Sequence, residues 1–218
     1  MTRRQLLKII EEGENLTVEF KQRFSSYEKI AKELIAFANT KGGIILFGID
    51  DNKSIYGVRS EKGENELVKI AAKQYCEPEI DFETEYINVN NKEIVVIKIP
   101  ESQNKPHRIQ DYRGRLDLNT AQVYIRVNDK SVPASKEMIK ILQTQSNGKG
   151  LKNYGLGKSE KIALNYLETH ETITVNDLCK AGNLSKRRAS RTLINLVRAN
   201  LLFIHTKENG ENYFSSSI

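Results

Sequence analysis

The spacing of apolar and polar residues predicts a first region that mixes strands with buried helices. From Tyr27 to Asn39 apolar residues recur every three to four positions, which is typical of a helix with a wide buried face. The segment Ile44 to Ile49 is almost continuously apolar, as expected for a strand covered on both sides. We therefore predict an α+β domain, a mixed sheet with packed helices. Further helices are expected at 3–12, at about 65–75 and from a Ser135 cap through Leu142, with strands at 17–21, 55–58, 82–89, 93–99 and 123–127.

A glycine-rich stretch predicts where this region ends. Residues 146–157 contain four glycines and few apolar side chains, so we interpret them as a linker between a domain at 1–145 and a smaller one at 158–218. In the smaller domain the pattern gives helix, helix, turn, helix and hairpin, the order of a winged helix-turn-helix. The segments are helices at 160–167, within 173–182 and after a Ser185 cap, and strands at 202–206 and 212–214.

Composition narrows the class of protein. Of 218 residues 39% are hydrophobic, and no apolar run approaches the roughly 20 residues that span a bilayer. We expect a soluble protein with no membrane partner and, by default, a cytoplasmic location. Cys76 and Cys179 lie far apart without a CxxC pair, so neither a disulfide framework nor a cysteine-rich zinc site is indicated.

The net charge of +6 is concentrated at the C-terminal end, where residues 147–218 hold 11 Lys and Arg against 6 Asp and Glu. Such an excess favours a polyanionic partner. In a winged helix the second helix of the turn pair enters the major groove of DNA with its first residues facing the bases. The alternative is a solvated basic face in a domain that makes protein contacts or dimerises. The candidate nucleic-acid contacts are Lys186, Arg187, Arg188 and Arg191 on this helix and Lys207 on the wing.

Three acids near the N-terminus form a second candidate site. Glu14 and Glu19 flank the start of the first strand, and Asp51, or its neighbour Asp50, follows the apolar strand. If the two strands pair side by side, the acids converge at one end of the sheet, where three carboxylates would hold Mg or Mn. Lys21 would project to the same side as Glu19 and hold a phosphate oxygen. In the alternative the glutamates are ordinary loop and strand residues and the aspartates form a turn.

A third segment, 107–119, interleaves basic residues with an aromatic ring. Such a pattern suits single-stranded or looped nucleic acid, because a ring stacks on a base while guanidinium groups hold phosphates. The alternative is an exposed hairpin tip with ordinary charges. The residues concerned are Arg108, Tyr112, Arg113 and Arg115, with Arg126 on the strand that follows.

The segments "ENLTVEFK", "IAFANTKGGIILFGIDD", "KPHRI" and "VYIRVNDKSVPAS" resemble, in that order, the Schlafen-type AlbA domain over roughly residues 10–145. Prokaryotic members of that family are often followed by a winged helix and are described as DNA-binding or transcription-regulator proteins. Animal relatives cleave tRNA and rRNA with two glutamates and an aspartate, which map onto Glu14, Glu19 and Asp51. Those relatives join two lobes, so a single lobe implies a homodimer. The chain lacks a GxxxxGK[ST] loop, which argues against a P-loop ATPase.

Two hypotheses follow. In the first, the protein is a metal-dependent endoribonuclease that acts on tRNA or other structured RNA, with Glu14, Glu19 and Asp51 as ligands and Lys21 on the phosphate. In the second, it is a transcriptional regulator without catalytic activity that binds duplex DNA through its winged helix. Geometry separates them, because oxygen ligands at about 2.0–2.6 Å from one cation require the three carboxylates to meet at a point.

Overall fold

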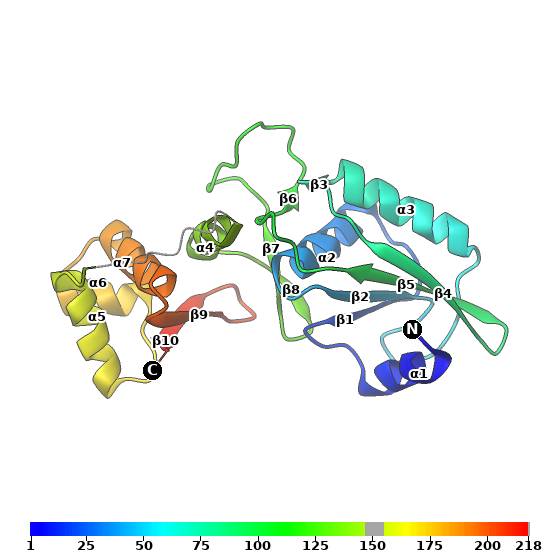
Figure 1. Ribbon diagram of the computed structural model, residues 1–218, viewed down its shortest axis with the longest axis horizontal. Coiled ribbons are helices and arrows are strands. Elements are labelled where there is room, and N and C mark those ends of the chain that lie inside the picture. The colour runs from blue at the N-terminus through cyan, green and yellow to red at the C-terminus, as the bar shows by residue number, and fades with distance from the viewer. Residues whose placement is uncertain (147–154, 218) are drawn as a thin grey trace. The chain divides into compact units, whose positions relative to one another are not determined.

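A mixed sheet lies at the centre of the first unit of the chain (Figure 1). The computed structural model describes residues 1–146 and 155–217, in two units, Met1–Pro133 and Ala134–Ile218. The first two strands pair side by side in parallel, which is the condition set for the acids to converge, and the other pairs are antiparallel. Across the sheet the strands are β1 (Val18–Lys21), β2 (Gly43–Phe47), β5 (Lys92–Ile99) and β4 (Glu83–Val89).

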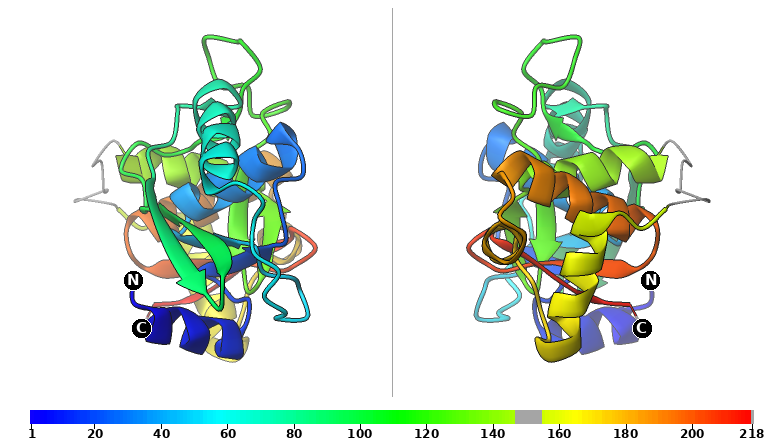
Figure 2. Two further views of the ribbon diagram at one scale, coloured as in Figure 1. Left: turned by 90° about the vertical axis from the view of Figure 1, so that its right-hand side faces the viewer. Right: turned by 90° about the vertical axis from the view of Figure 1, so that its left-hand side faces the viewer.

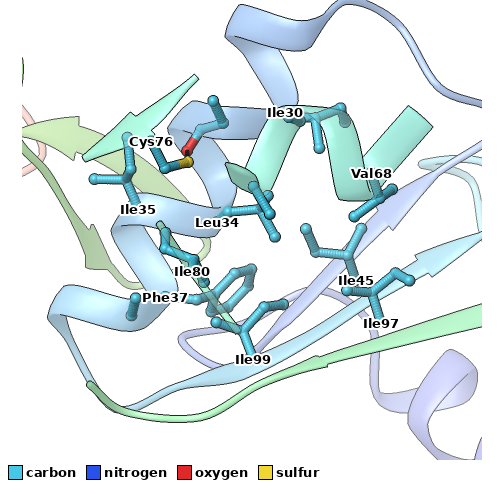
Figure 3. Close-up of a cluster of buried hydrophobic side chains, with 14 of the residues drawn as sticks. Ile30, Leu34, Ile35, Phe37, Ile45, Val68, Cys76, Ile80, Ile97 and Ile99 are labelled. Atoms are coloured by element: carbon cyan, nitrogen blue, oxygen red, sulfur yellow. Dashed lines mark hydrogen bonds between the residues drawn. The ribbon is translucent and has the colours of Figure 1, made fainter. Parts of the chain in front are cut away.

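Helices cover both faces of this sheet, as Figures 1 and 2 show. Because side chains alternate along a strand, Ile45 points to one face of β2 and Leu46 to the other. Ile45 joins the hydrophobic cluster drawn in Figure 3, between the sheet and two helices. Leu46 packs in a second cluster, against the helix on the other face of the sheet. The two helices on the first face are α2 (Tyr27–Asn39) and α3 (Glu61–Gln74), and the helix on the second is α1 (Arg3–Glu12).

Two details differ from the sequence prediction. The strand expected at 55–58 is reduced to one bridge between Ile49 and Ile55, because the next residues turn toward Gly48 and β5. Helix α3 begins earlier than expected, since the Ser60 hydroxyl accepts from the Gly63 N–H at 3.1 Å and caps it. Two small pairs complete the unit, β3 (Cys76–Glu77) with β6 (Arg108–Ile109), and β7 (Tyr124–Val127) with β8 (Lys130–Pro133).

The second unit has the predicted winged-helix order. Its first helix, α4, belongs with this unit although the sequence placed it in the first domain; the Ser190 hydroxyl on α7 donates to the Glu137 carboxylate on α4 at 2.6 Å. Of the predicted linker, residues 147–154 lie outside the described residues. The elements are α4 (Lys136–Ser146), α5 (Lys158–Thr169), α6 (Val175–Gly182), α7 (Lys186–Arg198), β9 (Leu202–Thr206) and β10 (Asn212–Ser216).

Among the described residues, no helix has the length and apolar character needed to cross a membrane.

Candidate nucleic-acid interface and acid cluster

The parallel pair β1 and β2 carries the predicted acids toward one edge of the sheet. Glu19 lies within β1, opposite Ile45 of β2. Strand β2 continues through Gly48, whose N–H donates to the Lys21 carbonyl at 2.8 Å, and then enters the turn that holds Asp51. Glu14 lies in the loop between α1 and β1. The strand pairing therefore brings the segment that holds Asp51 to the end of β1.

Glu14 shows that these acids share one electrostatic environment. Its carboxylate accepts a hydrogen bond from the Phe20 N–H at 2.8 Å, which holds the side chain against β1. Burial raises the pKa of Glu14, and the negative charges of Glu19 and Asp51 raise this pKa further, against the lowering effects of the Phe20 N–H and of Lys21. Crowded carboxylates of this kind are common at functional sites, although structural clusters also show them.

Both carboxylate oxygens of Glu19 are already engaged. The Lys21 ammonium donates to Oε1, so the two side chains lie on the same side of the strand, as predicted. The Arg126 guanidinium donates to Oε2 at 2.8 Å. With 7% of the residue exposed, Glu19 is a buried and doubly paired carboxylate.

This arrangement does not provide a ready metal site. The part of the chain that the structure describes contains no group of three or more His, Cys, Asp or Glu side chains placed to hold a metal ion. The physical reason lies in Glu19, whose oxygens face two cations. As placed, the residues Glu14, Glu19 and Asp51 do not fit Mg or Mn.

Arg126 is a structural residue, and this corrects its predicted role as a nucleic-acid contact. Its side chain has no exposed surface. The guanidinium also pairs with Glu33 at 3.2 Å, donates to the Asn15 carbonyl at 2.8 Å and lies 4.6 Å over the Phe37 ring. Glu33 was not among the predicted site residues, and its place beside the apolar stripe of α2 is the one sequence signal that its side chain is largely buried.

Arg108 requires the same correction. Only 3% of the residue is exposed, because its guanidinium donates to the Glu77 carboxylate at 2.8 Å and to the Arg113 carbonyl at 2.7 Å. The loop beyond keeps exposed groups of the predicted kind. Tyr112 is 87% exposed, and Arg113 and Arg115 are exposed beside it. Two of the four arginines predicted in this region therefore remain available to a polynucleotide.

Asn39 and His107, from the motifs "IAFANTKGGIILFGIDD" and "KPHRI", hold loops together. Asn39 donates to the carbonyls of His107 and Tyr124 and accepts from the His107 N–H. The His107 ring joins two more groups, the Pro78 carbonyl at 2.8 Å and the Ser102 hydroxyl at 2.7 Å. Burial lowers the pKa of His107, which keeps the ring neutral at pH 7. These contacts give the motifs a structural role.

Helix α7 presents a basic face to solvent. Ser185 caps it, and the helix has no acidic residue in its first turn. Its opposite face is buried through Leu193 and Leu196, which fixes the direction of the polar side. Lys207 is exposed on the wing, with its ammonium 5.9 Å from the centre of the Tyr213 ring. The exposed cations of α7 are the four that the sequence predicted: Lys186, Arg187, Arg188 and Arg191.

Comparisons with known protein families match the N-terminal and C-terminal parts of the chain separately. A model of the family described as Schlafen, AlbA_2 matches residues 14–135, and a model of the MarR family matches residues 154–210. The uncharacterized ATP-binding protein UU034 of Ureaplasma parvum serovar 3 is 36% identical over 99 residues, which are 39% of this chain and 28% of that relative. The match thus spans under a third of the relative's length. Together the two family matches indicate nucleic-acid binding.

Two solved structures are similar to parts of the chain. The N-terminal domain of a RecG-related protein from Nitrosomonas europaea has a TM-score of 0.42 at 23% identity, covering 53% of this chain and 84% of its own. The DIP2311 protein from Corynebacterium diphtheriae has a TM-score of 0.46 at 16% identity, covering 93% of this chain and 34% of its own.

Proposed function

Because the chain belongs to the Schlafen, AlbA_2 family and a MarR family match follows, we propose that it is a regulator that binds duplex DNA through α7. The observation that carries this proposal is the one-sided helix. Lys186, Arg187 and Arg191 are exposed at its beginning while its other face packs in the core of the second unit. Cations at the start of such a helix contact phosphates and reach base edges in the major groove.

Binding of a labelled duplex, followed by fluorescence anisotropy over a salt series, tests this function. The variant Arg187→Ala with Arg188→Ala should bind more weakly, and the slope of log affinity against log salt should fall by roughly 1 to 2, because each phosphate contact contributes about 0.9. The control variant Lys62→Ala with Lys73→Ala removes the same charge from exposed positions on α3. Equal losses in both variants would reduce the effect to net charge and remove α7 from the interface.

A second candidate is cleavage of structured RNA, such as tRNA, by the first unit. The observation that favours it is the position of Glu14, whose pKa is raised by burial first and then by the negative charges of Glu19 and Asp51. Lys21 would hold a phosphate oxygen beside them. A role for Mg or Mn in this proposal requires Glu19 to leave its ion pairs with Lys21 and Arg126.

Asp51 gives the sharper test of cleavage because it is exposed, so its replacement leaves the core intact. In this second candidate function wild-type protein cuts tRNA and Asp51→Asn abolishes the products, and loss of cutting with a chelator would show that the reaction needs a metal. Asp50→Asn tests the neighbouring acid, and Asp81→Asn is an exposed control outside the cluster. Undiminished cutting by Asp51→Asn and Asp50→Asn would exclude both aspartates from the reaction.

We also propose that two copies associate. The two-lobed relatives that the sequence resembles carry both lobes in one chain, whereas the AlbA_2 match here spans residues 14–135. Sedimentation velocity with and without duplex DNA measures this, and a single monomer boundary under both conditions would rule the homodimer out.

A further inference from the structure

A hollow of about 410 Å³ lies within the second unit, between the beginning of α5 and the basic face of α7. Two elements distant in sequence supply its walls, so its shape depends on their packing. Residues of the α5 turn form one wall: Gly157, Lys158, Ser159 and Glu160. Residues of the α7 cap and face form the other: Ser185, Arg187, Arg188, Arg191, Thr192 and Asn195.

The charge of this hollow is strongly positive. Lys158 and the three arginines of α7 line it and are exposed, whereas Glu160 is its one acidic lining residue. The Glu160 carboxylate folds over the first turn of α5; Oε2 lies 2.7 Å from the position that a Cβ on Gly157 would take. The hollow therefore already accommodates a negatively charged group beside a helix beginning, where N–H groups lack helical partners.

Two hydroxyl groups are the second observation. Ser159 and Thr192 are each only 4% exposed, and both line the hollow. Two hydroxyls that line one concave space can both donate hydrogen bonds to a group bound there. Cations around hydroxyl donors are the combination that binds phosphate oxygens.

We propose that this hollow binds one backbone phosphate of a nucleic acid, with Ser159 and Thr192 as hydroxyl donors and Lys158 as a cation. The inference rests on the proposed DNA-binding function and deepens it. A backbone phosphate fits better than a free anion because the charge continues beyond the hollow: Lys186 is exposed on the same helix but does not line it. The α5 turn thereby fixes the position of the duplex along α7.

The experiment compares full-length variants in binding a random-sequence duplex. Ser159→Ala with Thr192→Val should bind about ten-fold more weakly, as expected for lost hydrogen bonds to a charged group, with an unchanged salt slope because no charge is removed. Lys158→Ala should lower the slope by about one. Glu160→Gln should bind more tightly, since it removes the competing carboxylate. Thr172→Val, an exposed threonine outside the hollow, is the matched control.

Lys186→Ala separates this inference from the function on which it rests. If Lys186→Ala weakens binding while the double hydroxyl variant binds like wild type, the hollow is not a phosphate site and α7 still binds DNA. If the wild type binds no duplex, the proposed function fails, and the second arm uses inorganic phosphate followed by amide chemical shifts. Phosphate that shifts Ser159 and Thr192 in a chain that ignores duplex would make the hollow a free-anion site and overturn the backbone assignment. Melting curves check that each variant is folded.

Discussion

Replacing Arg126 by methionine should destabilise the first unit severely. Methionine keeps most of the apolar stem but removes the charge that Glu19 and Glu33 share, and their side chains are only 10% and 12% exposed. Removing one partner of a buried pair costs about 3–5 kcal/mol, because the remaining charge is left without compensation. Glu19 keeps Lys21 as a partner, so we expect a loss near the lower end, about 3 kcal/mol of unfolding free energy.

Hydrogen exchange of the full chain measures this loss by region. A change of about 3 kcal/mol is more than a hundred-fold in an opening equilibrium, so amides of β1 and β7 should lose at least that much protection. Amides of α7, in the other unit, serve as an internal control. Changing Glu19 and Glu33 to glutamine beside Arg126→Met should restore part of the protection, because neutral amides leave no unpaired charge. A loss below ten-fold in the single variant would show that the Arg126 network does not stabilise the unit.

Three further predictions concern single positions. Burial lowers the pKa of His107 below its value in the unfolded chain, so the unfolded chain takes up the proton first as the pH falls. The free energy of unfolding is therefore highest above about pH 6.5 and decreases below it, by up to about 1.4 kcal/mol per pH unit. Urea unfolding should therefore separate His107→Gln from wild type more at pH 7.5 than at 5.5, and an equal gap would refute this. Gly42→Ala should cost about 1–3 kcal/mol, since φ is +69° and the new Cβ would lie 2.6 Å from the Ile99 carbonyl oxygen, whereas Gly114→Ala, with open space around it, should melt like wild type. Tyr112→Ala should weaken binding of single-stranded RNA by about 1–3 kcal/mol in a filter assay if that exposed ring stacks on a base, and unchanged binding would exclude the loop.

Local features of the fold were predictable from the sequence because neighbouring residues determine them. Helix α2 has the predicted bounds, since its wide apolar stripe can be buried only as a helix. Asn90 and Asn91 form the tight turn between the strands predicted at 82–89 and 93–99, with φ values of 52° and 62°, which asparagine tolerates better than most residues. The predicted strand at 55–58 failed for the opposite reason, because its pairing depends on Gly48 and β5 rather than on its own pattern.

The fate of individual charges was not predictable, because burial of a charge depends on partners far away in the chain. Arg126 and Arg113 look alike in sequence, each a cation near aromatic and polar neighbours. Arg126 meets Glu19, 107 residues away, and is buried, whereas Arg113 stays on an exposed loop. Sequence periodicity shows that a position faces the core, but it does not show which acidic side chain will pair with a cation buried there.

The same distinction limits what mutation of the acid cluster can show. Glu19 is the residue that the family resemblance would select first, yet Glu19→Ala leaves the buried Arg126 guanidinium with a missing partner, so lost cleavage would not separate chemistry from folding. Asp51 has neither burial nor a recorded ion pair among the described residues, and its effect on Glu14 is electrostatic. A catalytic role for this cluster therefore has to be established at Asp51, and Glu19 is informative only in a chain whose Arg126 network has been shown to remain folded.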